Sequence, residues 1–211
     1  ISFSNSEPFL INYIFKFFEY FGMKRQNFSF DVQINTKNSR FNKNRLCAYW
    51  SKKSKITKTD VSNIFEYPEY GTKRSNNGRL DCKFYNIILK EIINNLIRYF
   101  VNRAKQNKNY AMYILRGLIA AEGYVSASTK SGSLSVVGIS SDLLSNKFHI
   151  QGMLNKLGIK SSINKNCVAI THIDNYNKVI KYDLLKISKD KSKFKRLYNN
   201  FRYNKTKLIS L

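Results

Sequence analysis

Two stretches of the chain, residues 1–24 and 136–160, repeat the same order of apolar and polar positions. Each has a short strand pattern, a serine followed by an acid, and apolar residues at helical spacing that end at a glycine. We expect the serine to cap the helix start and the glycine to end the helix in a left-handed conformation. These residues are Ser6, Glu7 and Gly22 in the first copy and Ser141, Asp142 and Gly158 in the second. The matching offsets indicate an internal duplication.

The second copy lies within a longer regular pattern. A helix at 109–123 and a hairpin at 124–139 are predicted around its start, and a second hairpin is predicted from the alternation of polar and apolar residues at 160–173. We expect a final helix at 175–187 and a further basic helix at 190–202. The repeating unit is therefore helix, hairpin, helix, hairpin, helix.

The first copy begins at the second strand of its first hairpin, so we expect its opening helix and first strand to be missing from the chain. Its next strand is predicted at 27–35, and an insertion follows near 36–78. The elements expected from there on are a helix at 42–54, a strand at 61–67, a loop at 70–78, a strand at 79–85 and a helix at 86–104. The expected fold class is α+β, with an incomplete unit at 1–106 and a second unit at 107–211.

The charge of the chain narrows the choice of partner. The chain has 37 Lys and Arg but only 13 Asp and Glu, so its formal net charge is +24. A charge of this size attracts polyanions. A protein of the membrane surface would concentrate its cations beside one amphipathic segment, whereas here they run the whole length. No apolar run has the length of a membrane span. Nucleic acid is the expected partner.

The cysteines indicate a reducing, intracellular compartment, either cytoplasm or an organelle matrix. Cys47, Cys82 and Cys167 are widely separated, and neither His149 nor His172 stands at zinc-ligand spacing from them. A zinc finger is therefore excluded, and a disulfide framework is not expected.

The helix at 109–123 carries the most specific motif. Its end, Leu115 to Gly123, reads LRGLIAAEG and resembles the LAGLIDADG motif of homing endonucleases. The eighth position of that motif, the catalytic acid, is Glu122, while the sixth is Ala120 in place of the usual Asp. The resemblance implies a two-repeat, monomeric protein of two αββαββα units whose antiparallel sheets form a saddle on the major groove of DNA.

The residues of this helix suit that chemistry. Glu122 lies against the unfavourable end of the helix dipole, so it needs a compensating cation, and Mg²⁺ or another divalent cation suits a carboxylate beside phosphate. Small residues allow a second helix to approach closely, and we expect this interface to include Gly117, Ala120, Ala121 and Gly123, the last as helix cap. The second catalytic acid is expected from the missing N-terminal segment or from another chain. The resemblance also suggests Lys189 as a basic residue near the scissile phosphate.

Strand alternation selects the residues expected to face DNA. On the first hairpin of the second unit they are Ser126, Ser128, Lys130, Ser133 and Ser135. On its second hairpin they are Lys160, Ser162, Asn164 and Lys165. In the first unit they are Ser29, Asp31 and Gln33, with Arg79, Asp81 and Lys83 on the partner strand.

The function expected is site-specific cleavage of double-stranded DNA at a long target site, by an intron-encoded or intein enzyme. A DNA-binding regulator that keeps the saddle and lacks cleavage is an alternative, as is a maturase that binds intron RNA. An RNA-binding protein would expose stacking aromatic side chains on its sheet, whereas the outward set here is polar.

Overall fold

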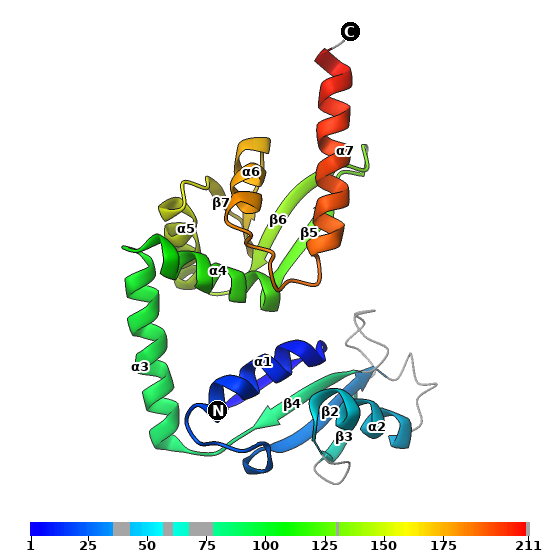
Figure 1. Cartoon of the computed structure of the whole chain (residues 1–211), viewed down its shortest axis with the longest axis vertical. Helices are drawn as coiled ribbons and strands as arrows, with labels where there is room; N and C mark the ends of the chain where they lie inside the picture. Colours follow the sequence, from blue (N-terminus) through cyan, green and yellow to red (C-terminus); the bar gives the residue numbers. More distant parts are fainter. Residues whose placement is uncertain (36–42, 57–60, 68–77, 130, 210–211) are drawn as a thin grey trace. The chain divides into compact units, whose positions relative to one another are not determined.

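The computed structural model describes residues 1–35, 43–56, 61–67, 78–129 and 131–209. The chain folds into two compact units, Ile1–Glu91 and Ile92–Leu211, and helix α3 (Ile87–Ala104) spans the division, ahead of the boundary expected after residue 106. Each unit combines helices with one four-stranded sheet, so the predicted α+β class is confirmed (Figure 1). Among the described helices, none is both long and apolar enough to cross a membrane.

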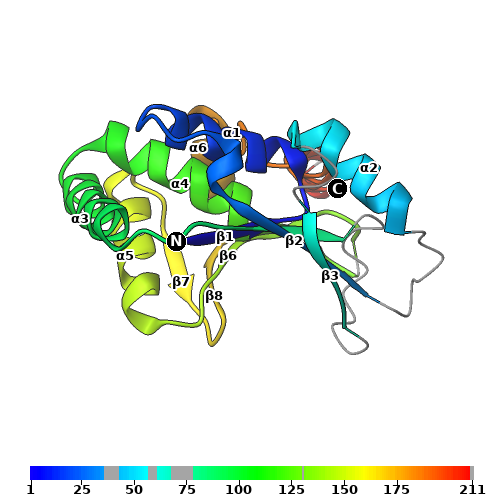
Figure 2. The same ribbon diagram turned by 90° about the horizontal axis from the view of Figure 1, so that it is seen from below.

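Unit 1 is a sheet with its helices on one side (Figure 2). Its elements are β1 (Ser2–Asn5), α1 (Pro8–Glu19), the short 3-10 helix η1 (Arg25–Asn27), β2 (Ser29–Asn35), α2 (Lys43–Ser54), β3 (Val61–Tyr67) and β4 (Arg79–Lys83). The strand order is β1-β4-β2-β3, with β4 antiparallel to both neighbours and β3 parallel to β2. Phe30 and Leu80 from the sheet are fully buried, as are Phe15 of α1 and Trp50 of α2.

Unit 2 contains the complete helix–hairpin pattern that the sequence predicts. Its elements are α4 (Lys108–Glu122), β5 (Gly123–Ala127), β6 (Leu134–Ser140), α5 (Leu144–Lys156), β7 (Ser161–Ile163), β8 (Cys167–Ile170), α6 (Ile173–Lys181) and α7 (Lys191–Ile209). The order is β5-β6-β8-β7, antiparallel throughout. Val137 and Ile170 of this sheet pack with Leu115 of α4, Met153 of α5 and Phe194 of α7 in one apolar core.

The two sheets share a common arrangement, as the duplication predicts. In unit 1 the order β1-β4-β2 matches β6-β8-β7 in unit 2, because β1 and β6 each precede a helix and then pair with the later strand of the next hairpin. Gly22 and Gly158, which follow those helices, both have a φ of +72°. Strand β3 comes from the insertion, and β5 has no counterpart among the described strands of unit 1.

Several helix boundaries differ from the prediction; α7, expected at 190–202, extends to Ile209. Helix α1 starts at Pro8 with Glu7 as its N-cap residue, and α5 starts after Leu143, so neither Ser6 nor Ser141 caps a helix. The Ser141 hydroxyl instead donates to the carbonyl of Leu143 at 3.4 Å, in the turn before the helix.

The helix predicted at 175–187 ends at Lys181. Asp183 takes a positive φ of 44°, which a helix cannot accommodate. Arg116 of α4 binds the carbonyls of Tyr182 and Asp183, at 2.8 and 3.1 Å. The turn after α6 is therefore held by another element and not by helix continuation.

Candidate nucleic-acid interface

Helix α4 presents an exposed acid at its C-terminal end. The Asn107 side chain caps its start and accepts from the backbone N–H of Asn109 at 2.8 Å. Its buried face, which includes Leu115 and Ile119, packs into the core of unit 2. This packing fixes the helix, and Glu122 is its last residue and is exposed.

Gly123 is the C-cap residue of α4, as predicted, but its backbone is not left-handed. Its φ of −80° and ψ of 154° are extended, and α4 passes directly into β5. A Cβ on Gly123 would lie 2.3 Å from the Ile119 carbonyl oxygen, closer than any side chain tolerates. Glycine is required here by the close approach of the backbone at the direct junction of α4 and β5.

The other small residues of the motif divide between two environments. Gly117 and Ala121 are exposed, and a Cβ on Gly117 would meet no other described atom of unit 2 within 4 Å. Ala120 is buried. Gly117 and Ala121 therefore form a flat, exposed strip on α4, and the predicted helix interface on this strip stays a prediction.

The segment 182–191, which runs from the end of α6 to the first residue of α7, is fastened near the end of α4. Asp190 Oδ2 accepts from the backbone N–H of Val125 at 3.2 Å, in the strand that directly follows Glu122. At the other end, Asp183 Oδ1 lies 3.1 Å from the Lys191 ammonium. The segment passes the junction of α4 and β5 within unit 2 (Figure 1). It carries Lys189, which is exposed; its role at a phosphate stays a prediction.

The outer face of the unit 2 sheet agrees in part with the predicted set. Ser126 and Ser162 lie on the face opposite the core, and Lys160, Asn164 and Lys165 are exposed. Lys130, which was also predicted to face DNA, lies outside the described residues.

The β6 end of the first hairpin is where the prediction fails. Ser133 is only 6% exposed, so the expectation that it faces solvent is wrong. The pairing shifts register between Ser126 and Ala127, which leaves Ser135 without a direct partner on β5. Such a bulge interrupts the alternation on which the prediction relied. Ser128 and Ser135 are half-buried.

Tyr124 is a residue of this face that sequence reasoning missed. It lies over Gly138 on β6, since a Cβ there would be 2.2 Å from the tyrosine ring. Its hydroxyl donates to the Cys167 sulfur on β8 at 3.3 Å, and this bond together with burial raises the pKa of Tyr124 to about 12. A glycine opposite an aromatic residue was the available signal, but it needs the strand register.

The outer face of the unit 1 sheet carries the six predicted residues in cross-strand pairs. Ser29 faces Lys83, Asp31 faces Asp81 and Gln33 faces Arg79, while Phe28, Phe30, Val32 and Ile34 are buried on the other side. The predicted facing of these strands is confirmed. Asn63 and Phe65 of β3 join the same face. They were missed because the sequence gives no sign that β3 pairs in parallel with β2.

The two acids of this face are enclosed by hydrogen bonds. Asp31 is 5% exposed and accepts from the Lys83 ammonium at 2.6 Å and from the Asn63 amide at 3.1 Å. Burial alone would raise the pKa of Asp31, but these hydrogen bonds and the Lys83 charge outweigh it, and the pKa is lowered. The same contact raises the pKa of Lys83. Asp31 is therefore a fixed anion within the face.

The described residues contain no group of three His, Cys, Asp or Glu side chains able to hold a metal ion. Glu122 offers a single exposed carboxylate. Mg²⁺ commonly takes one or two protein carboxylates and completes its shell with water and substrate phosphate. Glu122 fits such a role as one ligand among several, and it does not form a metal site by itself.

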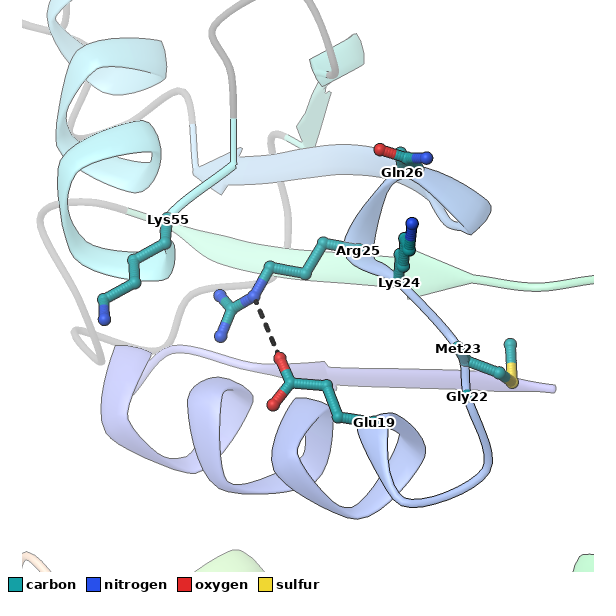
Figure 3. A pocket seen from close by; sticks show the side chains of 7 residues that line it. All are labelled: Glu19, Gly22, Met23, Lys24, Arg25, Gln26 and Lys55. Atoms are coloured by element: carbon teal, nitrogen blue, oxygen red, sulfur yellow. Dashed lines mark ion pairs between the residues drawn. The ribbon is translucent and has the colours of Figure 1, made fainter.

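A hollow of about 620 Å³ in unit 1 lies away from these residues, between the end of α1, η1 and the end of α2. Figure 3 shows Arg25 and Glu19 directed toward one another across it, with an ion-pair distance of 3.7 Å. Arg25 also donates to Asn12 and to the Ser54 carbonyl. Its guanidinium is therefore used in joining α1 to α2.

Comparison with known proteins identifies the domain that holds α4. Residues 109–198 match the family model of the LAGLIDADG-like domain. No curated protein and no solved structure matches the chain. The match begins within α4 and ends within α7, so it includes the motif at 115–123, both hairpins and the segment 182–191. Residues 109–198 are therefore similar to the LAGLIDADG-like domain, as the motif at 115–123 predicts.

Proposed function

We propose that this protein binds double-stranded DNA through the polar faces of its two sheets and hydrolyses the DNA backbone with the help of a divalent cation at Glu122. The observation that carries the proposal is the exposed Glu122 carboxylate at the end of a LAGLIDADG helix, with the segment that bears Lys189 fastened at the strand that follows. Homing endonucleases and maturases share this domain family.

The DNA-binding part of the proposal is supported by charge and shape. The formal net charge of +24 gives a strong attraction to a polyanion. The major groove admits a two-stranded ribbon, and each unit has antiparallel strands with polar residues on the face opposite its helices. Serine, glutamine and arginine on these faces are side chains that bind base edges or phosphates.

The cleavage part depends on what the chain places around Glu122. A bound Mg²⁺ would polarise the phosphate and lower the pKa of an attacking water. The chain's own contribution is positional: Gly123 fixes the junction of α4 and β5, and Asp190 holds the segment that bears Lys189. The Lys189 ammonium would then meet the charge of the scissile phosphate.

The test is a selection from a randomised duplex library with the purified chain and Mg²⁺, followed by sequencing of the cut ends. We expect cuts at a defined site with the wild type and none with Glu122→Gln, which keeps the shape of the side chain but binds the metal poorly. Electrophoretic binding to the selected site, measured without Mg²⁺, should be equal for the two proteins. Cutting by Glu122→Gln at the wild-type rate would refute the role of Glu122.

A second function is favoured by one observation, namely that Glu122 belongs to no group of three His, Cys, Asp or Glu side chains among the described residues. A LAGLIDADG protein that binds DNA as a regulator, or intron RNA as a maturase, would not need a metal site. Selective duplex binding without any cutting in the same library would favour the regulator. Tighter binding to a structured intron RNA than to any duplex would favour the maturase.

A further inference from the structure

The Arg79 side chain is held by polar contacts on the outer face of the unit 1 sheet. Its Nε lies 3.2 Å from Asp81 Oδ1, and its Nη2 donates to Gln33 Oε1 at 2.6 Å. Gln33 in turn donates from its amide to Asp81 Oδ2. The three side chains therefore form a closed set of contacts between β4 and β2.

Exposure differs sharply within this set. The Asp81 side chain is 11% exposed and that of Arg79 is 50% exposed. The acid is held beneath while the guanidinium reaches outward. A guanidinium has five N–H donors; one donates to Gln33, and Nε forms an ion pair with Asp81 Oδ1, an oxygen that accepts no hydrogen bond among the described residues. Its other donors have no acceptor among the described residues.

The remaining cation of this face is already neutralised. The ammonium of Lys83, also on β4, donates a hydrogen bond to Asp31 at 2.6 Å. Asp31 lies directly opposite Asp81 in the strand register. Each acid of the pair thus has its own cation. Of the two cations on β4, only Arg79 is both held by neighbouring side chains and exposed at its guanidinium. The two cations are therefore not equivalent toward a ligand.

We propose that Arg79 is a specificity-determining residue that binds the O6 and N7 atoms of one guanine in the major groove. This inference rests on the DNA-binding part of the proposed function and not on cleavage. Bidentate arginine at guanine is the commonest base-specific contact, and a guanidinium held in place loses little freedom on binding.

The same geometry argues against a phosphate as the ligand of Arg79. The Asp81 carboxylate lies 3.2 Å from Nε and offsets part of the positive charge. A phosphate carries a full negative charge and is repelled by that carboxylate. The guanine edge is neutral and offers two acceptors to the N–H donors of the guanidinium. The Asp81 carboxylate beneath Arg79 therefore favours a nucleobase over a DNA phosphate as the ligand of the guanidinium.

The experiment is a binding selection from a randomised duplex library without Mg²⁺, so that cutting plays no part. Arg79→Lys keeps the positive charge but removes the bidentate donor geometry of the guanidinium. Asp81→Asn keeps the arginine but weakens the ion pair that holds it in place. Arg45→Lys is the matched control, because Arg45 is exposed on α2, on the opposite side of the sheet. Thermal unfolding of all four proteins identifies any variant that fails to fold.

For the wild type we expect one target position with a preference for guanine of about 5- to 140-fold over other bases, as for a bidentate pair. Arg79→Lys should abolish that preference and Asp81→Asn should reduce it, while other positions and the Arg45→Lys site stay unchanged. Selective binding with the same guanine preference in Arg79→Lys would overturn the inference alone. Absence of any duplex binding by the wild type would overturn the proposed function and, with it, this inference.

Discussion

At the scale of single residues, two glycines of the same motif have opposite constraints. Gly123 admits no Cβ, because the Ile119 carbonyl oxygen would lie 2.3 Å away. Gly117 has open space on the exposed side of α4 within unit 2. Glycine is costly in a helix interior, so Gly117 weakens α4 unless something gains from the flat surface that it leaves.

This contrast gives a prediction for stability. Gly123→Ala should lower the free energy of unfolding by about 1–3 kcal/mol, because the junction of α4 and β5 must shift to accept a methyl group. Gly117→Ala should raise it by about 0.5–1 kcal/mol through helix propensity. Urea unfolding monitored by circular dichroism measures both. Equal losses in the two variants would contradict the difference in space at these positions.

A second prediction concerns Asp31, whose side chain is 7% exposed. Lys83→Met removes its charged partner while the Asn63 amide still donates to Asp31, so the pKa of Asp31 should rise and the variant should be less stable at pH 7. Solvent moderates the loss, because Lys83 is itself 35% exposed. Carbon-detected NMR titration of Asp31 and urea unfolding are the measurements.

The pH dependence of this loss has a definite sign. The pKa of Asp31 is lowered in the folded protein, so its contribution is present above the ordinary value of 3.8 and is lost as the pH falls through the lowered pKa. The pKa of Lys83 is raised, so its contribution is lost only as the pH rises above 10.5 through the raised value. The stability difference between the two proteins should therefore shrink below about pH 4. A difference that is constant down to pH 2 would argue against the ion pair.

At the scale of helices and strands, periodicity predicted the elements well and their boundaries poorly. The strand at 27–35 and the helix at 109–123 follow from alternation and helical spacing, and both are present. The end of α6 could not be predicted, because it depends on Arg116, distant in sequence, binding the carbonyls of the turn. The burial of Ser133 could not be predicted either, since a bulge depends on pairing between strands.

Strand order shows the same limit for the candidate site. Alternation correctly indicated that Asp31 and Asp81 face away from the core. It could not indicate that they are opposite one another, that each has its own cation, or that β3 adds Asn63 beside them. These facts depend on register across the sheet, which local sequence does not encode.

The segment 182–191 supports a prediction about positioning. Asp190→Ala removes the acceptor that holds it to Val125, so cleavage should slow by up to about 100-fold while binding to the selected site changes little. Amide exchange at the ends of the segment should increase in parallel. Lys191→Met, which breaks only the partly exposed pair with Asp183, is the control and should have a small effect. Slower cleavage without faster exchange would count against a positioning role.

At the scale of the whole molecule, the duplication bears on sequence preference, whereas the charge bears on affinity for any nucleic acid. The matching orders β1-β4-β2 and β6-β8-β7 give both units a sheet face opposite their helices, whereas the insertion adds a parallel strand to unit 1 alone. A face that differs between the units suits an asymmetric target better than a palindrome. The charge, by contrast, is spread over the helices as well and contributes affinity without sequence preference.

Helix α7 shows how that charge is carried on folded structure. Phe194, Leu197 and Tyr198 are buried in the core of unit 2, so the basic C-terminal run is an integral helix over the described residues. Its other sides expose Lys193, Lys195 and Arg196. These cations are therefore held on a rigid surface, where replacing them leaves the packing intact.

The last prediction follows from this arrangement. Wild-type affinity for its duplex should fall by about 10³–10⁵ between 50 and 200 mM salt, as for six to ten phosphate contacts. Glutamine at Lys193, Lys195 and Arg196 together should reduce the slope of log affinity against log salt by up to about 3, and leave the selected sequence unchanged. The matched triple variant carries glutamine at Arg45, Lys52 and Lys53, which are exposed on α2, opposite the polar face of unit 1. Its slope should change less, because removing distant charges weakens attraction without removing phosphate contacts. Equal slopes for the two triple variants would mean that α7 contributes only to the general field and does not touch the DNA backbone.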